Sequence, residues 1–81
     1  MFLEIITPDK KVFEGEVTSA QFPGSNGSFE VLDNHAPVIS TLDRGQIRII
    51  TNSGNQFFQV ESGVVEVLNN NIIVLVESVT A

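Results

Sequence analysis

Hydrophobic and polar residues alternate over much of the chain, and clusters of turn-forming residues interrupt the alternation about every 8–12 residues. In the second half, Ile47 and Ile49 alternate with polar neighbours, and Phe58 and Val60 do so after the hairpin-like run at 52–55. A period of two residues is typical of strands that bury one face. Since no stretch has helical periodicity, the pattern predicts an all-β protein.

The spacing of these segments is typical of an all-β sandwich or barrel, and we expect a two-sheet antiparallel β-sandwich of about ten short strands. The strands are expected within residues 2–6, 12–22, 28–32, 38–42, 46–51, 56–61, 64–68 and 72–79. Gly15 lies inside the second range, and a glycine within a strand is typical of a bend, so this range is interpreted as two strands that meet near Gly15. The run 72–79 is the most apolar, and we expect it near the middle of a sheet.

The composition fits one globular domain over residues 1–81, with 42% hydrophobic and 17% charged residues. Four Lys and Arg residues stand against ten Asp and Glu residues, a net charge of −6. This balance argues against nucleic-acid binding, which needs clustered cations, and against attraction to an anionic membrane surface. No apolar run reaches the length of a membrane helix, so we expect no direct membrane insertion. A partner with basic loops would suit the chain better.

His35 is the single histidine, and Asp33 and Ser40 lie close to it in the sequence. The three could be drawn as a base, its orienting carboxylate and a nucleophile, but a triad is defined by geometry and the chain has no nucleophile elbow. A histidine in a turn is more often a corner or interface residue. One histidine, no cysteine and scattered carboxylates give no spacing typical of metal ligands. We therefore expect no catalytic residues, metal, cofactor or small-molecule ligand.

Three further motifs have ordinary structural interpretations. Glu14 and Glu16 share one face of a strand, where a solvated surface is more common than a glycosidase pair. The glycine-rich run 24–27 lacks the lysine and the following helix of a phosphate-binding loop. The tripeptide 26–28 matches a glycosylation sequon, but it is a common turn sequence.

Two irregular corners, 23–27 and 33–37, flank the short strand expected at 28–32. Loops of a sandwich gather at its ends and often form binding surfaces. We expect both corners at one end, where they would form a surface for another protein.

Three stretches carry a resemblance to a known family: "TPDKKVFEGEV", "PGSNGSFEVLDNHAPVISTLDRGQIRI" and "FQVESGVVEVLNNNIIVLVE". The most specific element is P-G-x-x-G-x-F-x-V-L-x-x-H-A-P over 23–37, followed by L-x-x-G-x-I-R-I over 42–49. Together they resemble the N-terminal β-sandwich domain of the epsilon subunit of F-type ATP synthase, over nearly the whole chain. Glu30 stands where the family usually has glycine, Ser62 replaces the first of two glycines, and Val64 replaces a phenylalanine.

Typical epsilon subunits continue into a C-terminal helical hairpin that inhibits ATP hydrolysis and in some members binds ATP. This sequence stops at Ala81, after the last expected strand. It is either short by nature or a shortened piece. In both cases the resemblance implies that hairpin-dependent inhibition and nucleotide binding are absent from these residues.

The resemblance implies a non-catalytic central-stalk subunit, which binds the gamma subunit along its side and the ring of membrane c subunits at one end. It implies a peripheral position at the cytoplasmic face of the bacterial inner membrane, within the ATP synthase. The c-ring contacts expected from it are Ser25, Asn26, Gly27, Ser28, Glu30, Asn34 and His35. The gamma contacts expected from it are Thr7, Pro8, Pro37, Val38 and Ser40.

Two alternatives stay open on the sequence. A free-standing sandwich that binds peptide or carbohydrate would need an exposed aromatic platform, but the chain has no Trp or Tyr, and its six Phe mostly occupy expected core positions. A small hydrolase would need His35 as its base. Detection of a complex with gamma would distinguish a stalk subunit from both of these alternatives.

Overall fold

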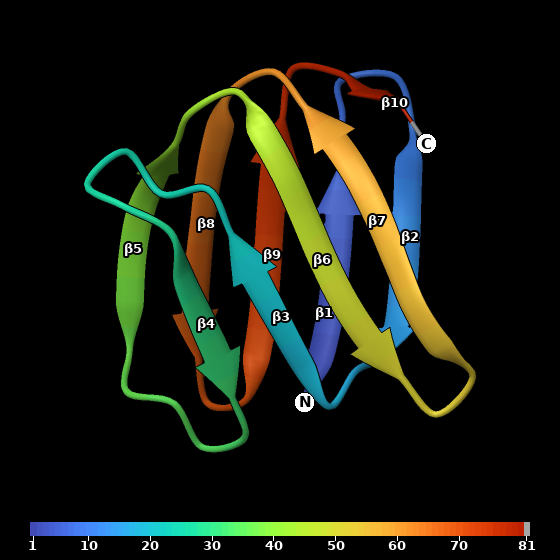
Figure 1. The fold of residues 1–81 in the computed structure, drawn as a ribbon, viewed down its shortest axis with the longest axis vertical. Helices are drawn as coiled ribbons and strands as arrows, with labels where there is room; N and C mark the ends of the chain where they lie inside the picture. The colour runs from blue at the N-terminus through green and yellow to red at the C-terminus, as the bar shows by residue number, and fades with distance from the viewer. Residues whose placement is uncertain (81) are drawn as a thin grey trace.

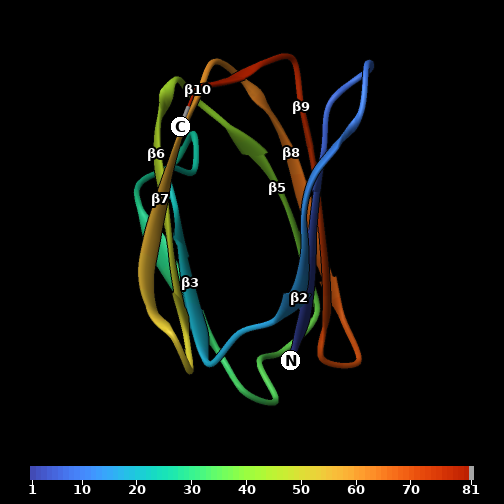
Figure 2. The ribbon, with the colours of Figure 1, turned by 90° about the vertical axis from the view of Figure 1, so that its right-hand side faces the viewer.

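Alternating hydrophobic positions form strands throughout the computed structural model, which describes residues 1–80 (Figure 1). The strands are β1 (Phe2–Ile6), β2 (Lys11–Glu16), β3 (Ser19–Phe22), β4 (Phe29–Leu32), β5 (Val38–Leu42), β6 (Gly45–Thr51), β7 (Gly54–Val60), β8 (Gly63–Leu68), β9 (Asn71–Val76) and β10 (Val79–Thr80). They form two layers that face each other, seen edge-on in Figure 2. The predicted all-β sandwich of about ten short strands is confirmed.

Each layer is a five-stranded sheet. The first sheet has the order β2-β1-β9-β8-β5, and the second has the order β10-β7-β6-β3-β4. The pairs are antiparallel except one: β1 runs parallel to β9, with Leu3 opposite Ile72. Alternation along a strand does not encode the direction of its neighbour, so the predicted antiparallel arrangement missed this pair. The expected central place of the last apolar run is confirmed, because β9 is the middle strand of the first sheet.

The core lies between the sheets and is made of the inward-facing half of each alternating strand. Its buried members are Leu3, Ile5, Val17, Ala20, Phe22, Val31, Leu42, Ile47, Ile49, Phe58, Val60, Val65, Val67, Ile72, Val74 and Val76. Phe13 packs edge-on against Phe58 with ring centroids 5.9 Å apart, and Phe29 packs against Phe22 at 5.7 Å. Four of the six phenylalanines thus belong to the core or pack against it, whereas Phe57 is 48% exposed.

The bend between the second and third strands lies two residues beyond its predicted position. Gly15 is a regular member of β2, opposite Leu3. The chain leaves the first sheet at Val17, whose N–H donates to the carbonyl of Met1, and enters the second at Thr18, whose N–H donates to the carbonyl of Ile50. The prediction of a corner at Gly15 is therefore wrong, because paired backbone groups continue through the glycine and change partners only after it.

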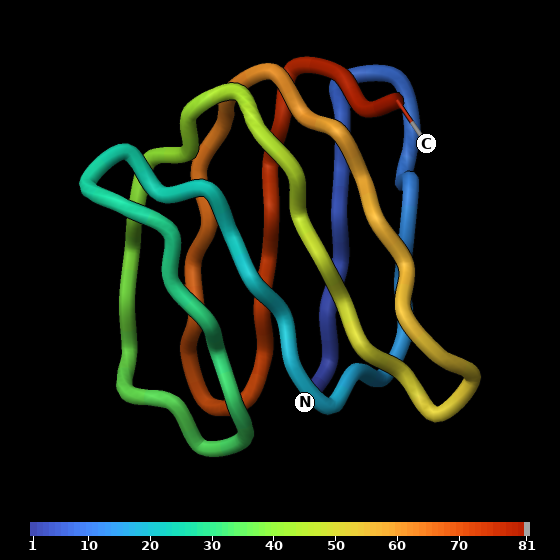
Figure 3. The backbone as a smooth tube through the Cα atoms, in the orientation of Figure 1, coloured from blue at the N-terminus to red at the C-terminus, as the bar shows by residue number. Residues whose placement is uncertain are grey.

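The two corners around β4 lie at opposite ends of the sandwich (Figure 3). The chain passes straight from the 23–28 turn into β4 and from β4 into the 33–37 turn, so the strand separates them. The expectation that both corners gather at one end is wrong. It missed that consecutive loops of an antiparallel sheet alternate between its two ends.

Candidate functional site

The 23–28 turn projects from one end of the sandwich, and residues 25–28 are exposed. Its backbone is closed by the N–H of Gly27, which donates to the carbonyl of Gly24 at 3.0 Å. Gly27 has φ 121°, a conformation that residues with a Cβ rarely adopt. A Cβ on Gly24 would lie 2.7 Å from the carbonyl oxygen of Gly27. Both glycines are therefore required by the shape of the turn.

Side chains fasten this turn to the segment that joins β5 and β6. The hydroxyl of Ser25 donates to Asp43 Oδ1 at 3.0 Å, and that of Thr41 donates to Ser25 Oγ at 2.7 Å. The N–H of Asp43 donates to the carbonyl of Pro23 at 2.9 Å. The turn is thus a fixed protrusion whose tip, Asn26, faces solvent.

Glu30 lies further along β4, on the outer face of the second sheet. Arg48 reaches it across Gln21, with Nη2 donating to Glu30 Oε2 at 3.2 Å. Nε of the same guanidinium is buried without a hydrogen-bond partner. Glu30, which departs from the family's usual glycine, therefore has a charge partner on its own sheet.

The histidine does not form a triad with its sequence neighbours. His35 hydrogen-bonds through Nδ1 to the carbonyl oxygen of Ala36 at 2.7 Å, while the Ser40 hydroxyl donates to the Thr41 carbonyl. Asp33 instead lies 3.8 Å from the amine of Met1. Among the described residues the three candidate groups thus have separate partners, and His35 is a corner residue.

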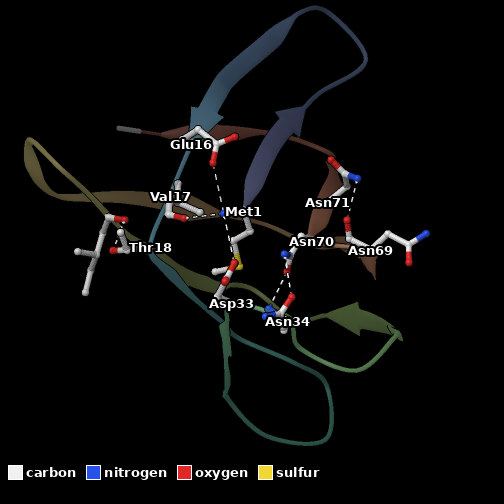
Figure 4. A network of polar contacts seen from close by, with 10 residues as sticks. Met1, Glu16, Val17, Thr18, Asp33, Asn34, Asn69, Asn70 and Asn71 are labelled. Carbon is white, nitrogen blue, oxygen red and sulfur yellow. Dashed lines mark hydrogen bonds and ion pairs between the residues drawn. The ribbon is translucent and has the colours of Figure 1, made fainter.

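The end that carries His35 is tied together by asparagines and by the amine of Met1 (Figure 4). Asn34 and Asn70 bond each other twice. The amine of Met1 donates to the carbonyl of Val17 at 3.2 Å and lies 3.3 Å from Glu16 Oε1. Asn69 and Asn70 both have positive φ, 52° and 62°. The link between Asn70 and Asn34 had no signal in the sequence, because it joins residues 36 positions apart.

The outer face of the first sheet carries an apolar surface that the sequence analysis missed. We call this surface the apolar face and define it by Ile39, Leu68, Ile73 and Leu75, all exposed, with the half-buried Phe2, Ile6 and Val64 beside them. Ile39 is 71% exposed, the largest value among the exposed aliphatic residues. Within the run 71–76, every second residue points outward. The signal was therefore present, as an apolar run without the polar alternate positions of a solvated strand.

Three shallow hollows line this face. One of about 360 Å³ lies between Thr7, Pro8 and Leu75. Another of about 370 Å³ includes Pro37 and Val38. The third, of about 330 Å³, lies over β1, β8 and β9. Four of the five expected gamma contacts thus lie at the rim of the apolar face.

Ser40 is the exception. Alternation along β5 turns Ile39 and Thr41 outward, and Ser40 pairs with the buried Val65 and faces inward. Val38 also faces inward and packs against the core, although it contributes to its hollow. The two β5 residues expected from the resemblance therefore have inward-facing side chains, whereas Ile39 between them faces outward.

In the described part of the chain, no group of three acidic or histidine side chains is arranged to hold a metal ion. No helix within residues 1–80 is long and apolar enough to cross a membrane. A carbohydrate- or peptide-binding platform is not favoured, because Phe57 is the single large exposed aromatic side chain among the described residues.

A family model for the "ATP synthase, Delta/Epsilon chain, beta-sandwich domain" matches residues 1–81. The chain belongs to this family. It is 40% identical over 79 residues to the ATP synthase epsilon chain of Chlorobium limicola, covering 96% of this chain and 90% of that one. It is 39% identical over 75 residues to the ATP synthase epsilon chain of Leptospira interrogans, of which it covers 59%. The resemblance read from the sequence is confirmed.

Solved structures share the fold. A chain of the Euglena gracilis mitochondrial ATP synthase matches with a TM-score of 0.89 at 16% identity, over 96% of this chain and 51% of that chain. A chain in the central stalk and c-ring structure of the Tetrahymena thermophila mitochondrial enzyme matches with a TM-score of 0.82 at 18% identity, over 99% and 65%. The epsilon chain is a non-catalytic subunit of ATP synthase, so family membership assigns no catalytic residue to this sandwich.

Proposed function

We propose that this chain is a rotor subunit of an F-type ATP synthase that fastens the gamma subunit to the c-ring and so couples ion flow to ATP synthesis. It would work at the cytoplasmic face of a bacterial inner membrane, as a peripheral part of the complex. The observation that carries the proposal is the apolar face on one flat side of a family member that also has a fixed polar turn at one end.

The apolar face is the proposed surface for gamma. Exposed contiguous apolar surface is uncommon on a protein that works alone and marks interaction sites. Ile39 and Leu75 would contribute the aliphatic contacts, with Thr7, Pro8, Pro37 and Val38 around them. Val38 faces inward but contributes to one of the hollows, whereas Ser40 faces inward and lines none of the three, so Ser40 is left out of this set.

The end that carries residues 25–28 is the proposed surface for the c-ring, with Glu30 at its margin. The fixed turn and the net charge of −6 suit a partner with basic loops. Asn34 and His35 are removed from this set because they follow β4, whereas residues 25–28 precede it. They share a polar hollow with Pro37, next to the apolar face, so we propose them as neighbours of the gamma surface.

A close-packed sandwich suits this mechanical task. Each elementary charge that crosses the membrane provides about 2.3 kcal/mol per 100 mV, and several such steps accumulate for each ATP. A connector that unfolded locally would lose this work. Two sheets with interdigitated side chains form a block of low compressibility, which transmits torque without yielding.

Binding to gamma tests the proposal. Ile39→Asn removes the most exposed aliphatic side chain of the apolar face, and Leu32→Asn removes one that is 54% exposed on the outer face of the second sheet. We expect Ile39→Asn to weaken binding to purified gamma about tenfold, as loss of an interface anchor does, and Leu32→Asn to leave it unchanged. Wild-type protein that does not bind gamma would overturn the proposal.

A further inference from the structure

Glu66 places a carboxylate in the middle of the apolar face. It lies on β8, directly opposite Ile73 of β9 on one side and Ile39 of β5 on the other. Its neighbours on the same face of its own strand are Val64 and Leu68. Aliphatic side chains therefore surround this carboxylate on four sides.

The other carboxylates of the same sheet face have cations beside them. Lys11 Nζ lies 2.9 Å from Glu4 and 3.3 Å from Glu14, and the Met1 amine lies 3.3 Å from Glu16. No ion pair or hydrogen bond within residues 1–80 involves the side chain of Glu66, which is exposed to solvent. Water therefore solvates this charge in the free subunit.

Two of the hollows on this face meet at Glu66. One includes Glu4 and Ile73, the other includes Pro37 and Ile39, and Glu66 and Leu68 contribute to both. A partner that fills either hollow must cover Glu66 and remove its water. Removing one member of a buried ion pair is strongly destabilising, because an uncompensated buried charge remains. A purely apolar partner surface would therefore bind poorly here.

We infer that Glu66 accepts a basic side chain of the partner, an arginine or lysine that projects from an otherwise aliphatic surface. The inference rests on the proposed function, so the partner is the contact surface of gamma. An arginine would fit well, since its planar guanidinium can donate two hydrogen bonds to one carboxylate. The apolar residues would supply contact area, and the charge pair would fix the position of gamma on the sheet.

A second copy of this chain fits the face less well. Two copies would each bring a net charge of −6, and a symmetric contact through this face would place like charges against each other. Nothing basic on the face could compensate Glu66, because Lys11 is already shared by Glu4 and Glu14.

The test compares Glu66→Gln with Glu61→Gln, two variants that each remove one negative charge. In Glu66→Gln we expect about tenfold weaker binding to gamma and a shallower dependence of affinity on salt concentration. Glu66→Lys should bind more weakly still. The matched control is Glu61→Gln, at an exposed site paired with Arg44 at 3.2 Å, and it should retain wild-type affinity and salt dependence.

The outcomes separate the two proposals. Wild-type protein that fails to bind gamma overturns both. Wild-type binding together with equal affinity and equal salt dependence in Glu66→Gln overturns the role of Glu66 and leaves the rotor function standing. A self-association seen by sedimentation that Ile39→Asn abolishes would assign the face to a second copy and overturn the inference. Unchanged thermal unfolding of Glu66→Gln establishes that any loss of binding is not a loss of folding.

Discussion

Asn34 and Asn70 lie 36 residues apart in the chain and bond each other twice. The N–H of Asn34 donates to Asn70 Oδ1 at 2.6 Å, and Asn70 Nδ2 donates to Asn34 Oδ1 at 3.1 Å (Figure 4). Both residues have φ 62°. This reciprocal pair joins the corner after β4 to the hairpin between β8 and β9, and so links the two sheets at the end that carries His35.

Replacing Asn70 by glycine should destabilise the protein by about 1 kcal/mol, the net value of one to two hydrogen bonds at a partly exposed site. Glycine accepts the positive φ, so the loss would report the amide alone. Asn69→Gly is the control, because Asn69 also has positive φ (52°) but its side chain makes none of the hydrogen bonds found among residues 1–80. Urea unfolding measures both. Equal midpoints would show that the pair contributes nothing.

Gly63→Ala should destabilise the sandwich by about 1–3 kcal/mol, as overpacking does. A Cβ at this position would overlap the carbonyl oxygen of Leu75 and lie 2.7 Å from Val76 Cγ1. At Gly15 a Cβ would only touch the ring of Phe13 at 3.5 Å. Gly15→Ala should therefore be neutral or slightly stabilising. Thermal unfolding of the two variants compares them directly, and equal melting temperatures would contradict the packing argument.

The charged side chain of Lys11 should stabilise the folded protein, and this stabilisation should disappear at alkaline pH. Hydrogen bonds that the Lys11 ammonium donates, first to Glu4 and second to Glu14, raise the pKa of Lys11 above 10.5. Because the pKa of Lys11 is higher in the folded than in the unfolded protein, its stabilisation of the fold is fully present below pH 10.5. This stabilisation is lost as pH rises through the folded pKa. Wild-type protein should thus be more stable than Lys11→Met near neutral pH, and the difference should shrink above pH 10.5. Lys10→Met is the control, and a difference that does not depend on pH would refute the assignment.

Ser28→Lys should weaken attachment to the c-ring, because it places a cation on the end proposed to meet basic loops. ATP-driven proton pumping in membrane vesicles measures the coupling, and we expect it to fall while ATP hydrolysis continues. Ser53→Lys adds the same charge to an exposed turn at the other end of the sandwich and should pump normally. Proton pumping at the wild-type level in Ser28→Lys would show that the c-ring does not bind at this end of the sandwich.

The sequence predicted most of the strands, because a buried face imposes a period of two that is visible residue by residue. The ranges 38–42 and 64–68 match β5 and lie within β8. The run 72–79 divides into β9 and β10, because the chain changes sheets between Val76 and Val79 and apolar residues occur on both sides. Such a change depends on which strand supplies the partner groups, and no local pattern encodes it.

The candidate site was predicted less well, for a related reason. Ser25, Asn26, Gly27 and Ser28 do form one exposed turn, because Gly-rich turn chemistry is local. The exposed side of the first sheet depends on the position of β9 between β1 and β8, so its apolar residues resembled core positions. Three-dimensional neighbours such as Glu66 and Ile39 become visible only through the strand register.

The parallel pairing of β1 with β9 sets the order in which the chain can fold during synthesis. β1 is made long before β9 and has β2 on one side, and its other edge stays open until about 70 further residues have been made. Long-range pairing of this kind slows folding. Until it forms, the unpaired N–H and C=O groups of β1 remain available to other chains. Until β9 is made, Phe2–Ile6 therefore presents an unpaired edge through which a nascent chain can aggregate.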